Sequence, residues 1–553
     1  MIIGLDMGGT HTDVALLKDG EIYKKTKYPR QEDFLESILM PLDEIMEDED
    51  PAEIKRVLLS TTLSTNAIVE DKLGKVGMIL EPGPGLNLDF LKDILPVHFI
   101  SGYIDHRGRE KFPIDLDEVK AAGKYIKEEL GAEYLGIVSK FSTRNPLHEQ
   151  KIYETIGPSF EYSTLGHTLS GNLNYPRRLY STYLNSGVWK IYKQFLQAIK
   201  QSLDERNINA PLFILKADGG TLAGDAALER PVETVLSGPA ASIMGAAALE
   251  HVDEDGIILD IGGTTTDIAF LADGVPLFEP RGIEVSGFKT LVRGLYSRSC
   301  GVGGDSLVRL VDGEVQVGPK RLGPAVAFGG DHPTPTDALV IKGKIKEGSK
   351  EKATKGLKPL ADEKGVSIEE MADLIYEKTA DIIVENINKY LDEVHSRPVY
   401  TIYELLHGKK LDPKKVVLVG APASAFVEAI SERLGITCII PEGFEAANAL
   451  GAALSRVTTE LTVVADTQEK TLVIGEEGIR EKIPSNFTKK DAEKVLFSHL
   501  KERCVNMGGD PSSPMEIVEE EEFNVVRGFY TSGKIIKLKG QIRPGIRSGD
   551  YNA

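Results

Sequence analysis

Two stretches of the chain repeat one pattern of apolar runs and polar turns. Residues 4–17 read GLDMGGTHTDVALL, residues 258–271 read ILDIGGTTTDIAFL, and Asp-Gly follows them at 19–20 and 273–274. An apolar run ending in Asp, a Gly-Gly-Thr turn, a second apolar run and an Asp-Gly turn predict a three-stranded antiparallel meander. Copies this far apart indicate a duplicated domain, because a solenoid would repeat every few tens of residues.

The repeated turn has the residue types of a phosphate site. Its glycines let backbone N–H groups approach a ligand closely, and its threonines add hydroxyl donors. Its carboxylates would repel a phosphate unless Mg²⁺ lay between, since Mg²⁺ takes one or two carboxylates plus phosphate oxygens. The alternative is a plain hairpin turn whose Asp caps its own backbone. We predict catalytic carboxylates at Asp6, Asp13, Asp260 and Asp267, with the metal on Asp6 and Asp260, and nucleotide contacts at Gly8, Gly9, Thr10, Thr12, Gly262, Gly263, Thr264 and Thr265.

Further polar or glycine-rich segments follow predicted buried strands. STTLSTNA at 60–67 and ADGGT at 217–221 each follow such a strand, and GVGGDS at 301–306 is a third glycine-rich turn. Ligands of open α/β sheets bind at the carboxyl ends of strands, and helix N-termini attract anions. A helix N-cap or a plain strand-to-helix connection is the alternative at each place. We predict substrate contacts at Thr61, Thr62, Thr65, Asn66, Asp218 and Ser237, and nucleotide contacts at Gly303, Gly304, Gly420 and Ala421.

Apolar residues at helical spacing predict two long helices. One covers 184–203 and is expected to bridge the two halves, and the other runs from a capping box at Ser367 to about 394. Segment 103–109 reads as a charged surface loop, 333–338 as a stiff loop, and 342–364 as an exposed connector or lid. A helix lined by Ala and Gly at 446–454 permits close approach of a second helix.

The C-terminal part of the chain has a different pattern. Strands near 461–464 and 471–474, a helix near 488–504 and a hairpin turn at 532–533 predict a small α+β domain. This domain carries no recognisable chemistry.

Composition limits the classes of function. A chain of 553 residues predicts ~3–4 domains. The net charge of −19 argues against nucleic acid or an anionic membrane as a partner. The three cysteines, Cys300, Cys438 and Cys504, form no CxxC motif and indicate a reducing, cytoplasmic environment. A strand beginning at Ile2 leaves no room for a signal peptide, and no apolar run approaches the ~20 residues of a membrane span.

The order of these segments resembles the superfamily of actin, sugar kinases, acetate kinase and heat-shock chaperone ATPases. More narrowly, residues 1–457 resemble the A subunit of ATP-dependent hydantoinases and oxoprolinases. The resemblance rests on the repeated motif and on the blocks LSTTLSTNAIVEDKLGKVGMI, NPLHE, RRLYSTYLN, KADGGTL, SGPAAS, GVGGDS and PTPTDA in that order. The chain departs from the family pattern at Cys300, at Ala421-Pro422, at 101–109 and in its last ~95 residues, and it lacks the second catalytic unit fused in oxoprolinases.

The resemblance implies an α/β fold of two RNase H-like domains with ATP in the cleft between them. The expected division is 1–184, 185–457 with its last helix returning to the first domain, and a C-terminal α+β domain at 458–553. The phosphates would contact both hairpins, and adenine would lie against the strand end at Gly420. The family opens hydantoins, 5-oxoproline and related lactams at the cost of ATP, and related members activate ketones for carboxylation. A separate B-type subunit is the implied partner.

Three hypotheses follow for the function. The leading one is an ATP- and Mg²⁺-dependent hydrolase subunit that phosphorylates the amide or carbonyl oxygen of a cyclic amide. The second is a small-molecule kinase that releases a stable phosphorylated product without a partner. The third is a nucleotide-driven activator or scaffold of a partner enzyme, and its iron–sulfur form is disfavoured by three scattered cysteines.

Overall fold

The computed structural model describes residues 1–8, 11–19, 21–29, 31, 36–250, 252–396 and 410–546, which form two compact units. Unit 1 contains Met1–Gly238, Glu279–Gly294 and Ser455–Ala553, and unit 2 contains Pro239–Phe278 and Leu295–Leu454. Within the described ranges, no helix combines the length and the apolar composition that crossing a membrane requires. The three-domain division stays a prediction, but the helix expected to bridge the halves lies wholly inside unit 1.

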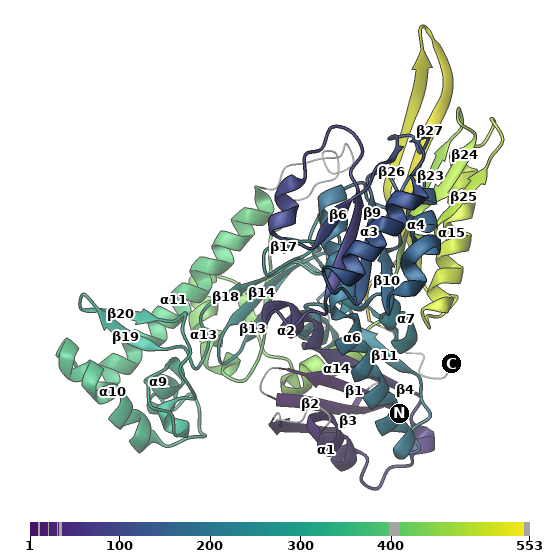
Figure 1. Cartoon of the computed structure of the whole chain (residues 1–553). Helices are drawn as coiled ribbons and strands as arrows, with labels where there is room; N and C mark the ends of the chain where they lie inside the picture. The colour runs from purple at the N-terminus through teal and green to yellow at the C-terminus, as the bar shows by residue number, and fades with distance from the viewer. Residues whose placement is uncertain are drawn as a thin grey trace. The chain divides into compact units, whose positions relative to one another are not determined.

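The first sheet of unit 1 contains the N-terminal repeat (Figure 1). The two apolar runs pair antiparallel as β1 and β2, and β3 follows on β2, so the predicted meander is present. Strands β4 and β11 run parallel to β1 on its other side, so β1, β4 and β11 end at one edge of the sheet. The strand order is β12-β11-β4-β1-β2-β3, with bounds Ile2–Met7 (β1), His11–Lys18 (β2), Glu21–Pro29 (β3), Arg56–Thr61 (β4), Leu212–Leu215 (β11) and Thr221–Ala223 (β12).

A second sheet of unit 1 is parallel throughout, in the order β10-β9-β5-β6. Its central strands are continuous apolar runs because helices cover both faces. Helices α3 and α4 pack on one face and α6 on the other, where Trp189 of α6 stacks on Tyr162. The bounds are Val76–Glu81 (β5), Val97–Phe99 (β6), Tyr134–Ser139 (β9), Tyr162–Leu165 (β10), Leu116–Glu128 (α3), Leu147–Ile156 (α4) and Tyr175–Glu205 (α6). Shorter helices of unit 1 are Glu36–Ile45 (α1), Leu63–Val69 (α2), Gly166–Leu169 (α5) and Gly224–Glu229 (α7).

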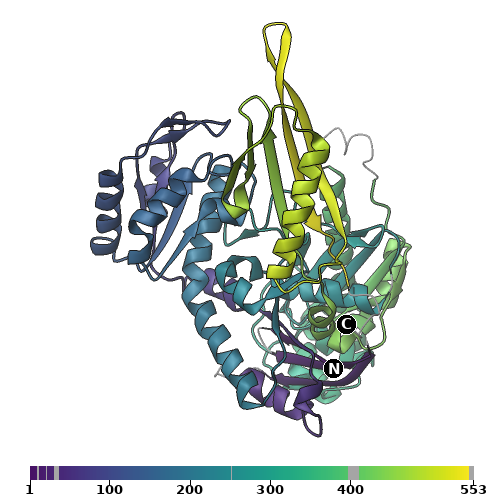
Figure 2. The same cartoon turned by 90° about the vertical axis from the view of Figure 1, so that its right-hand side faces the viewer.

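The C-terminal residues of unit 1 form a five-stranded antiparallel sheet in the order β25-β24-β23-β27-β26. Helix α15 packs across it (Figure 2), and the β26–β27 hairpin extends beyond the other strands of this sheet. The hairpin turn was predicted at 532–533, but residues 532–533 lie within β27. The structure places the turn at 528–529. The bounds are Glu460–Asp466 (β23), Thr471–Ile474 (β24), Ile479–Lys482 (β25), Met515–Arg527 (β26), Tyr530–Ile542 (β27) and Lys489–Asn506 (α15).

The charged segment 103–109 of unit 1 is partly buried and does more than a plain surface loop. It connects β7 (Tyr103–Ile104) to β8 (Glu110–Phe112). Asp105 is buried and accepts a hydrogen bond of 2.8 Å from Nε of Arg109. Arg107 donates from Nε to Asp466 of β23 over 2.9 Å, so the loop attaches the C-terminal sheet. Its charges are paired, which the sequence pattern alone did not show.

Unit 2 contains the second repeat, again as an antiparallel meander. Its sheet has the order β15-β14-β13-β21-β22, β18 pairs with β14, and β21 runs parallel to β13. The core lies between this sheet and the helices α9, α10, α11 and α13. The bounds are Gly256–Ile261 (β13), Thr266–Ala272 (β14), Val275–Pro276 (β15), Ser297–Cys300 (β18), Lys415–Val419 (β21), Thr437–Ile439 (β22), Pro335–Ile341 (α9), Lys350–Lys364 (α10), Ile368–His395 (α11) and Ala423–Leu434 (α13).

Two segments of unit 2 differ from their predictions. Residues 342–364 were expected to be an exposed connector, but α10 occupies most of them, because Ala353, Leu357 and Ala361 form a buried stripe after the Ser349 N-cap. The stiff loop at 333–338 begins α9 instead. Asp337 is buried there and closes a capping box with Thr334.

The predicted close helix approach is present between α8 (Ser237–Leu249) and α14 (Ala447–Leu454) in unit 2. A Cβ on Gly451 would lie 2.1 Å from the carbonyl oxygen of Ala241, and one on Gly245 would lie 1.8 Å from that of Ala447. Only glycine fits at these two positions, so a bulky substitution at Gly451 would separate the helices.

Candidate functional site

The first repeat places its polar residues where β1 and β4 end. Thr12 is fully buried, and its hydroxyl has no hydrogen-bond partner among the described residues. The N–H of Gly8 donates to the carbonyl of His11 over 3.0 Å and closes the turn from one side. Asp6 and Asp13 are directly opposite one another in the β1–β2 register. The predicted contacts at Gly9 and Thr10 lie outside the described residues.

Asp13 has a cationic partner in this structure. Its Oδ1 lies 3.0 Å from Nζ of Lys27, which projects from the same face of neighbouring β3. The carboxylate charge is therefore partly neutralised within the meander.

Five of the six predicted substrate residues lie beside this turn. The hydroxyl of Thr62 lies 3.4 Å from the carbonyl oxygen of Met7, and Nδ2 of Asn66 donates to that hydroxyl over 3.3 Å. The hydroxyl of Ser237 donates to the carbonyl of Thr61 over 2.9 Å, and that of Thr65 accepts from the N–H of Leu236 over 2.9 Å.

These hydroxyls also hold secondary-structure elements together. Their hydrogen bonds connect β4, α2 and the start of α8, whereas an N-cap would bond only within its own helix. The sixth predicted residue, Asp218, is elsewhere in unit 1, hydrogen-bonded to Thr458 over 2.9 Å.

The second repeat is more densely surrounded by polar groups. The hydroxyl of Ser242 lies 2.6 Å from Oδ2 of Asp260 and 2.9 Å from Oδ1 of Asn448. These three side chains come from α8, β13 and α14. Sequence reasoning missed Ser242 and Asn448 as site residues, although Asn448 is the lone polar residue of an Ala-rich helix.

Gly420 approaches this cluster through its backbone. Its φ is 97°, and a Cβ there would lie 2.7 Å from Oδ1 of Asp260 and 2.3 Å from the carbonyl oxygen of Ile261. A side chain is excluded at this strand end. Ala421 follows it at the entrance to α13.

Gly303 and Gly304 of the third turn were predicted to contact the nucleotide, but their N–H groups donate hydrogen bonds within the protein. The N–H of Gly304 donates to the carbonyl of Gly262 over 2.9 Å, and that of Gly303 donates to the hydroxyl of Ser306 over 2.8 Å. The N–H of Gly262 closes its own turn on the carbonyl of Thr265 over 2.9 Å. The structure therefore stacks the turn at 301–306 on the turn at 262–265.

Asp267 lies opposite Asp260 in the β13–β14 register, as Asp13 does in the first copy. Burial, with the negative charge of Asp260 nearby, raises the pKa of Asp267 to about 6, against the opposing hydrogen bond from Ser299. Cys300 is 3% exposed, and burial raises its pKa to about 11. Its thiolate is disfavoured, which argues against thiol chemistry at this turn.

The oxygen atoms around Asp260 are suitable ligands for a hard cation. The carboxylate, the Ser242 hydroxyl and the Asn448 amide present oxygen, which is the ligand type that Mg²⁺ selects. Among the described residues, no three His, Cys, Asp or Glu side chains gather as a metal site. A magnesium ion here would need ligands from phosphate oxygens and water in addition.

Comparison with known proteins identifies relatives across both units. The profile described as "Hydantoinase/oxoprolinase N-terminal region" matches residues 2–158, and the one described as "Hydantoinase/oxoprolinase" matches residues 178–461. Caprolactamase subunit alpha of Pseudomonas jessenii is 25% identical over 507 residues, covering 82% of this chain and 70% of the relative. The acetophenone carboxylase gamma subunit of Aromatoleum aromaticum is 23% identical, covering 71% and 61%. The 5-oxoprolinase of Saccharomyces cerevisiae is 25% identical, covering 66% of this chain and 29% of the relative.

The fold is that of a solved relative. The crystal structure of ATP-dependent caprolactamase from Pseudomonas jessenii superposes with a TM-score of 0.76 at 20% identity, covering 99% of this chain and 88% of that one. This match includes the C-terminal sheet, which was expected to differ from the family's usual tail. The mixed α/β fold is confirmed, and the family resemblance stated from the sequence motifs is correct. The chain belongs to the hydantoinase/oxoprolinase family.

Proposed function

We propose that this chain is an ATP-dependent enzyme subunit that phosphorylates the amide or carbonyl oxygen of a cyclic amide and so activates it for ring opening. The observation that carries the proposal is the turn built twice, with Asp6 opposite Asp13 and Asp260 opposite Asp267. A single turn-forming Asp would not need that second carboxylate. Relatives named as a caprolactamase and a 5-oxoprolinase support a lactam as the substrate class.

The proposed chemistry uses ATP to make the amide carbon electrophilic. The amide oxygen attacks the γ-phosphorus, the bond from that phosphorus to the leaving ADP breaks, and an O-phosphorylated amide forms. Water adds to the carbon and the carbon–nitrogen bond breaks, which gives an amine and an acyl phosphate. A second water attacks the acyl carbon and releases phosphate. Phosphoryl transfer of this kind needs alignment and charge neutralisation more than a covalent enzyme intermediate.

The residues have distinct proposed roles. Gly9, Thr10, Gly263, Thr264 and Thr265 would bind phosphate oxygens, Gly8, Thr12 and Gly262 would shape the two turns, and Gly420 and Ala421 would lie against adenine. Magnesium, when held by Asp6 or Asp260, would neutralise phosphate charge. Asp13 and Asp267 would orient these turns or take up a proton. The arrangement of the units as two RNase H-like domains around one ATP stays a prediction.

A partner subunit is part of the proposal. Three relatives are named as subunits: caprolactamase alpha, acetophenone carboxylase gamma and acetone carboxylase beta. We propose a separate B-type subunit that completes ring opening.

The test is product analysis by mass spectrometry after incubation with Mg-ATP and a panel of lactams, hydantoins and polyols. A ring-opened product with stoichiometric ADP supports the proposal. A stable phosphorylated polyol would show a small-molecule kinase instead. ATP hydrolysis that no panel compound changes would favour the nucleotide-driven activator.

A further inference from the structure

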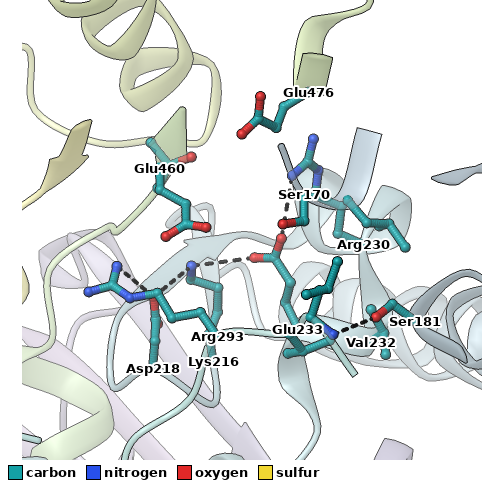
Figure 3. Close-up of a pocket in the computed structure, with 14 residues that line it drawn as sticks. Ser170, Ser181, Lys216, Asp218, Arg230, Val232, Glu233, Arg293, Glu460 and Glu476 are labelled. Atoms are coloured by element: carbon teal, nitrogen blue, oxygen red, sulfur yellow. Dashed lines mark hydrogen bonds and ion pairs between the residues drawn. The ribbon is translucent and has the colours of Figure 1, made fainter. Parts of the chain in front are cut away.

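Half of the 14 residues that line a small cavity in unit 1 are charged (Figure 3). Its volume is about 40 Å³, which is room for about three water molecules or a small polar group. Its walls come from the segment after β11, from residues 230–233 and 291–293, and from the C-terminal sheet. The charged residues among them are Lys216, Asp218, Arg230, Glu233, Arg293, Glu460 and Glu476.

Most of these charges have partners within or next to the wall. Nζ of Lys216 lies 3.2 Å from Asp218 and 3.3 Å from Glu233, and Glu460 pairs with Lys539 over 2.8 Å. Burial alone would raise the pKa of Asp218, but Lys216 and Arg293 outweigh it and hold that pKa below its usual value. The ion pairs fix the shape of the cavity and leave these groups little need of a ligand.

Glu476 is the exception. It is 4% exposed, and neither carboxyl oxygen makes a hydrogen bond to a described residue. Its carboxyl group points into the space beside Glu460 and Arg230 (Figure 3). Burial raises its pKa above the usual value, which outweighs the opposing influence of its own backbone N–H, Arg503 and Thr462. A buried carboxyl group without a hydrogen bond is costly, so Glu476 is a group of this cavity that a polar ligand would stabilise.

In its protonated form, a carboxyl group matches one ligand chemistry closely. It carries one O–H donor and one carbonyl acceptor side by side. A small lactam ring forces its amide into the cis form, which places the amide N–H and C=O on the same side. The two groups can therefore form two hydrogen bonds at once, one in each direction.

Building on the proposed function, we propose that this cavity binds the cis-amide group of a cyclic amide, with both oxygens of Glu476 hydrogen-bonded to that amide. The position agrees with the role. Lys216 directly follows β11, which is parallel to β4 and β1, so this wall of the cavity lies at the same sheet edge as the carboxyl end of β1. Ligands of open α/β sheets gather at this edge.

Three variants of the full chain test the site. Glu476→Met removes both hydrogen bonds at similar volume, whereas Glu476→Gln keeps one donor and one acceptor. Glu477→Met is the matched control, because Glu477 is adjacent, pairs with His499 over 2.7 Å and does not line this cavity. The probes are 2-pyrrolidinone and N-methyl-2-pyrrolidinone, measured by ligand-observed NMR titration, and an ATP analogue is titrated separately.

We expect 2-pyrrolidinone to bind the wild type, E476Q and E477M with similar affinity and E476M about tenfold or more weakly, since two hydrogen bonds are lost. N-methyl-2-pyrrolidinone should bind the wild type as weakly as 2-pyrrolidinone binds E476M, and ATP-analogue affinity should be the same in all four proteins. The proposal is overturned if E476M matches E477M, if methylation has no effect, or if 2-pyrrolidinone does not bind.

The proposed function fails separately. If 2-pyrrolidinone binds in the expected pattern but no cyclic amide is opened with ATP, the site stands and the reaction is wrong. If cyclic amides are opened and E476M has an unchanged KM for them, the reaction stands and this site is wrong.

Discussion

The strand pairs that flank the two Gly-Gly segments share a register but differ in their surroundings. In the first copy Asp13 is paired with Lys27, which lies on the adjacent strand of the meander. In the second copy Asp267 has no such ion pair among the described residues, and its pKa is raised to about 6 by burial and by Asp260. Ser242 lies beside Asp260 and Asn448. Ser242 comes from α8 and Asn448 from α14, and these two helices pack closely at Gly245 and Gly451.

The two strand pairs therefore share a register, while the electrostatic surroundings of their carboxylates differ. The first copy has neutralised part of its charge, and the second keeps two nearby carboxylates in a polar oxygen cluster. Asp267 has no ion pair among the described residues, so a metal ion beside it would supply positive charge that Lys27 supplies to Asp13. We therefore propose that the second copy has the larger share of metal-dependent chemistry.

Removing divalent metal should have the largest effect. We expect ATP turnover to be lost in excess EDTA and restored by added Mg²⁺ or Mn²⁺, because neither copy can neutralise phosphate charge alone. Coupled measurement of ADP release checks this. Full turnover in EDTA would show that neither carboxylate pair holds a metal.

Asp6, near the end of β1, and Asp260, near the end of β13, should give the next largest effect. Their variants distinguish the two copies of the motif. Asp260→Asn should lower kcat by about 10²-fold or more, the scale for loss of one key electrostatic group. Asp6→Asn should lower kcat by a smaller factor. Steady-state ATP turnover, with thermal melting to confirm folding, checks both variants. Equal losses, or a larger loss at Asp6, would contradict the asymmetry drawn between the copies.

A glycine pair in unit 2 sharpens the account of the second copy. Gly420→Ala and Gly435→Ala both place a side chain at positive φ, where strain costs about 1–2 kcal/mol. Only the first also collides with Asp260 and Ile261, since a Cβ on Gly435 meets nothing within 4 Å. We expect Gly420→Ala to weaken ATP-analogue binding about tenfold while Gly435→Ala leaves it unchanged. Equal affinity in calorimetric titration would remove Gly420 from the nucleotide site.

The smallest expected effect is at Cys300. It sits beside Asp267 in the sheet, yet its thiol is buried with a pKa raised to about 11. Cys300→Ser should keep turnover within about twofold, and native Cys300 should resist iodoacetamide near pH 8 because little thiolate is present. Mass spectrometry of labelled peptides measures this. Rapid labelling at Cys300 with loss of turnover would make it a functional thiol.

Much of the fold could be predicted from local pattern. The two meanders follow from apolar runs broken by Gly-Gly-Thr and Asp-Gly, and the capping box at Ser367 begins α11 as expected. The segment at 342–364 could not be predicted, since its helix depends on a buried stripe of Ala353, Leu357 and Ala361 amid many lysines. The local sequence pattern predicts a helix or strand when the residues of that segment determine its structure. The prediction fails when packing against another element determines it.

The candidate site shows the same limit. The turn residues were evident because they repeat, but Ser242 and Asn448 come from different helices and meet only through the α8–α14 contact. Glu476 lies in a region that was predicted to carry no chemistry, and its significance comes from burial without a partner. Contacts between residues so far apart in the chain produce no regular residue spacing, so a single sequence does not reveal them.

The most direct test of the central claim follows one oxygen atom. A lactam labelled with ¹⁸O at its carbonyl is incubated with the enzyme and Mg-ATP, and the phosphate that is released is analysed by mass spectrometry. If the amide oxygen attacks the γ-phosphorus and both waters then attack carbon, each turnover transfers one ¹⁸O atom to phosphate. Ring opening with unlabelled phosphate would contradict this account.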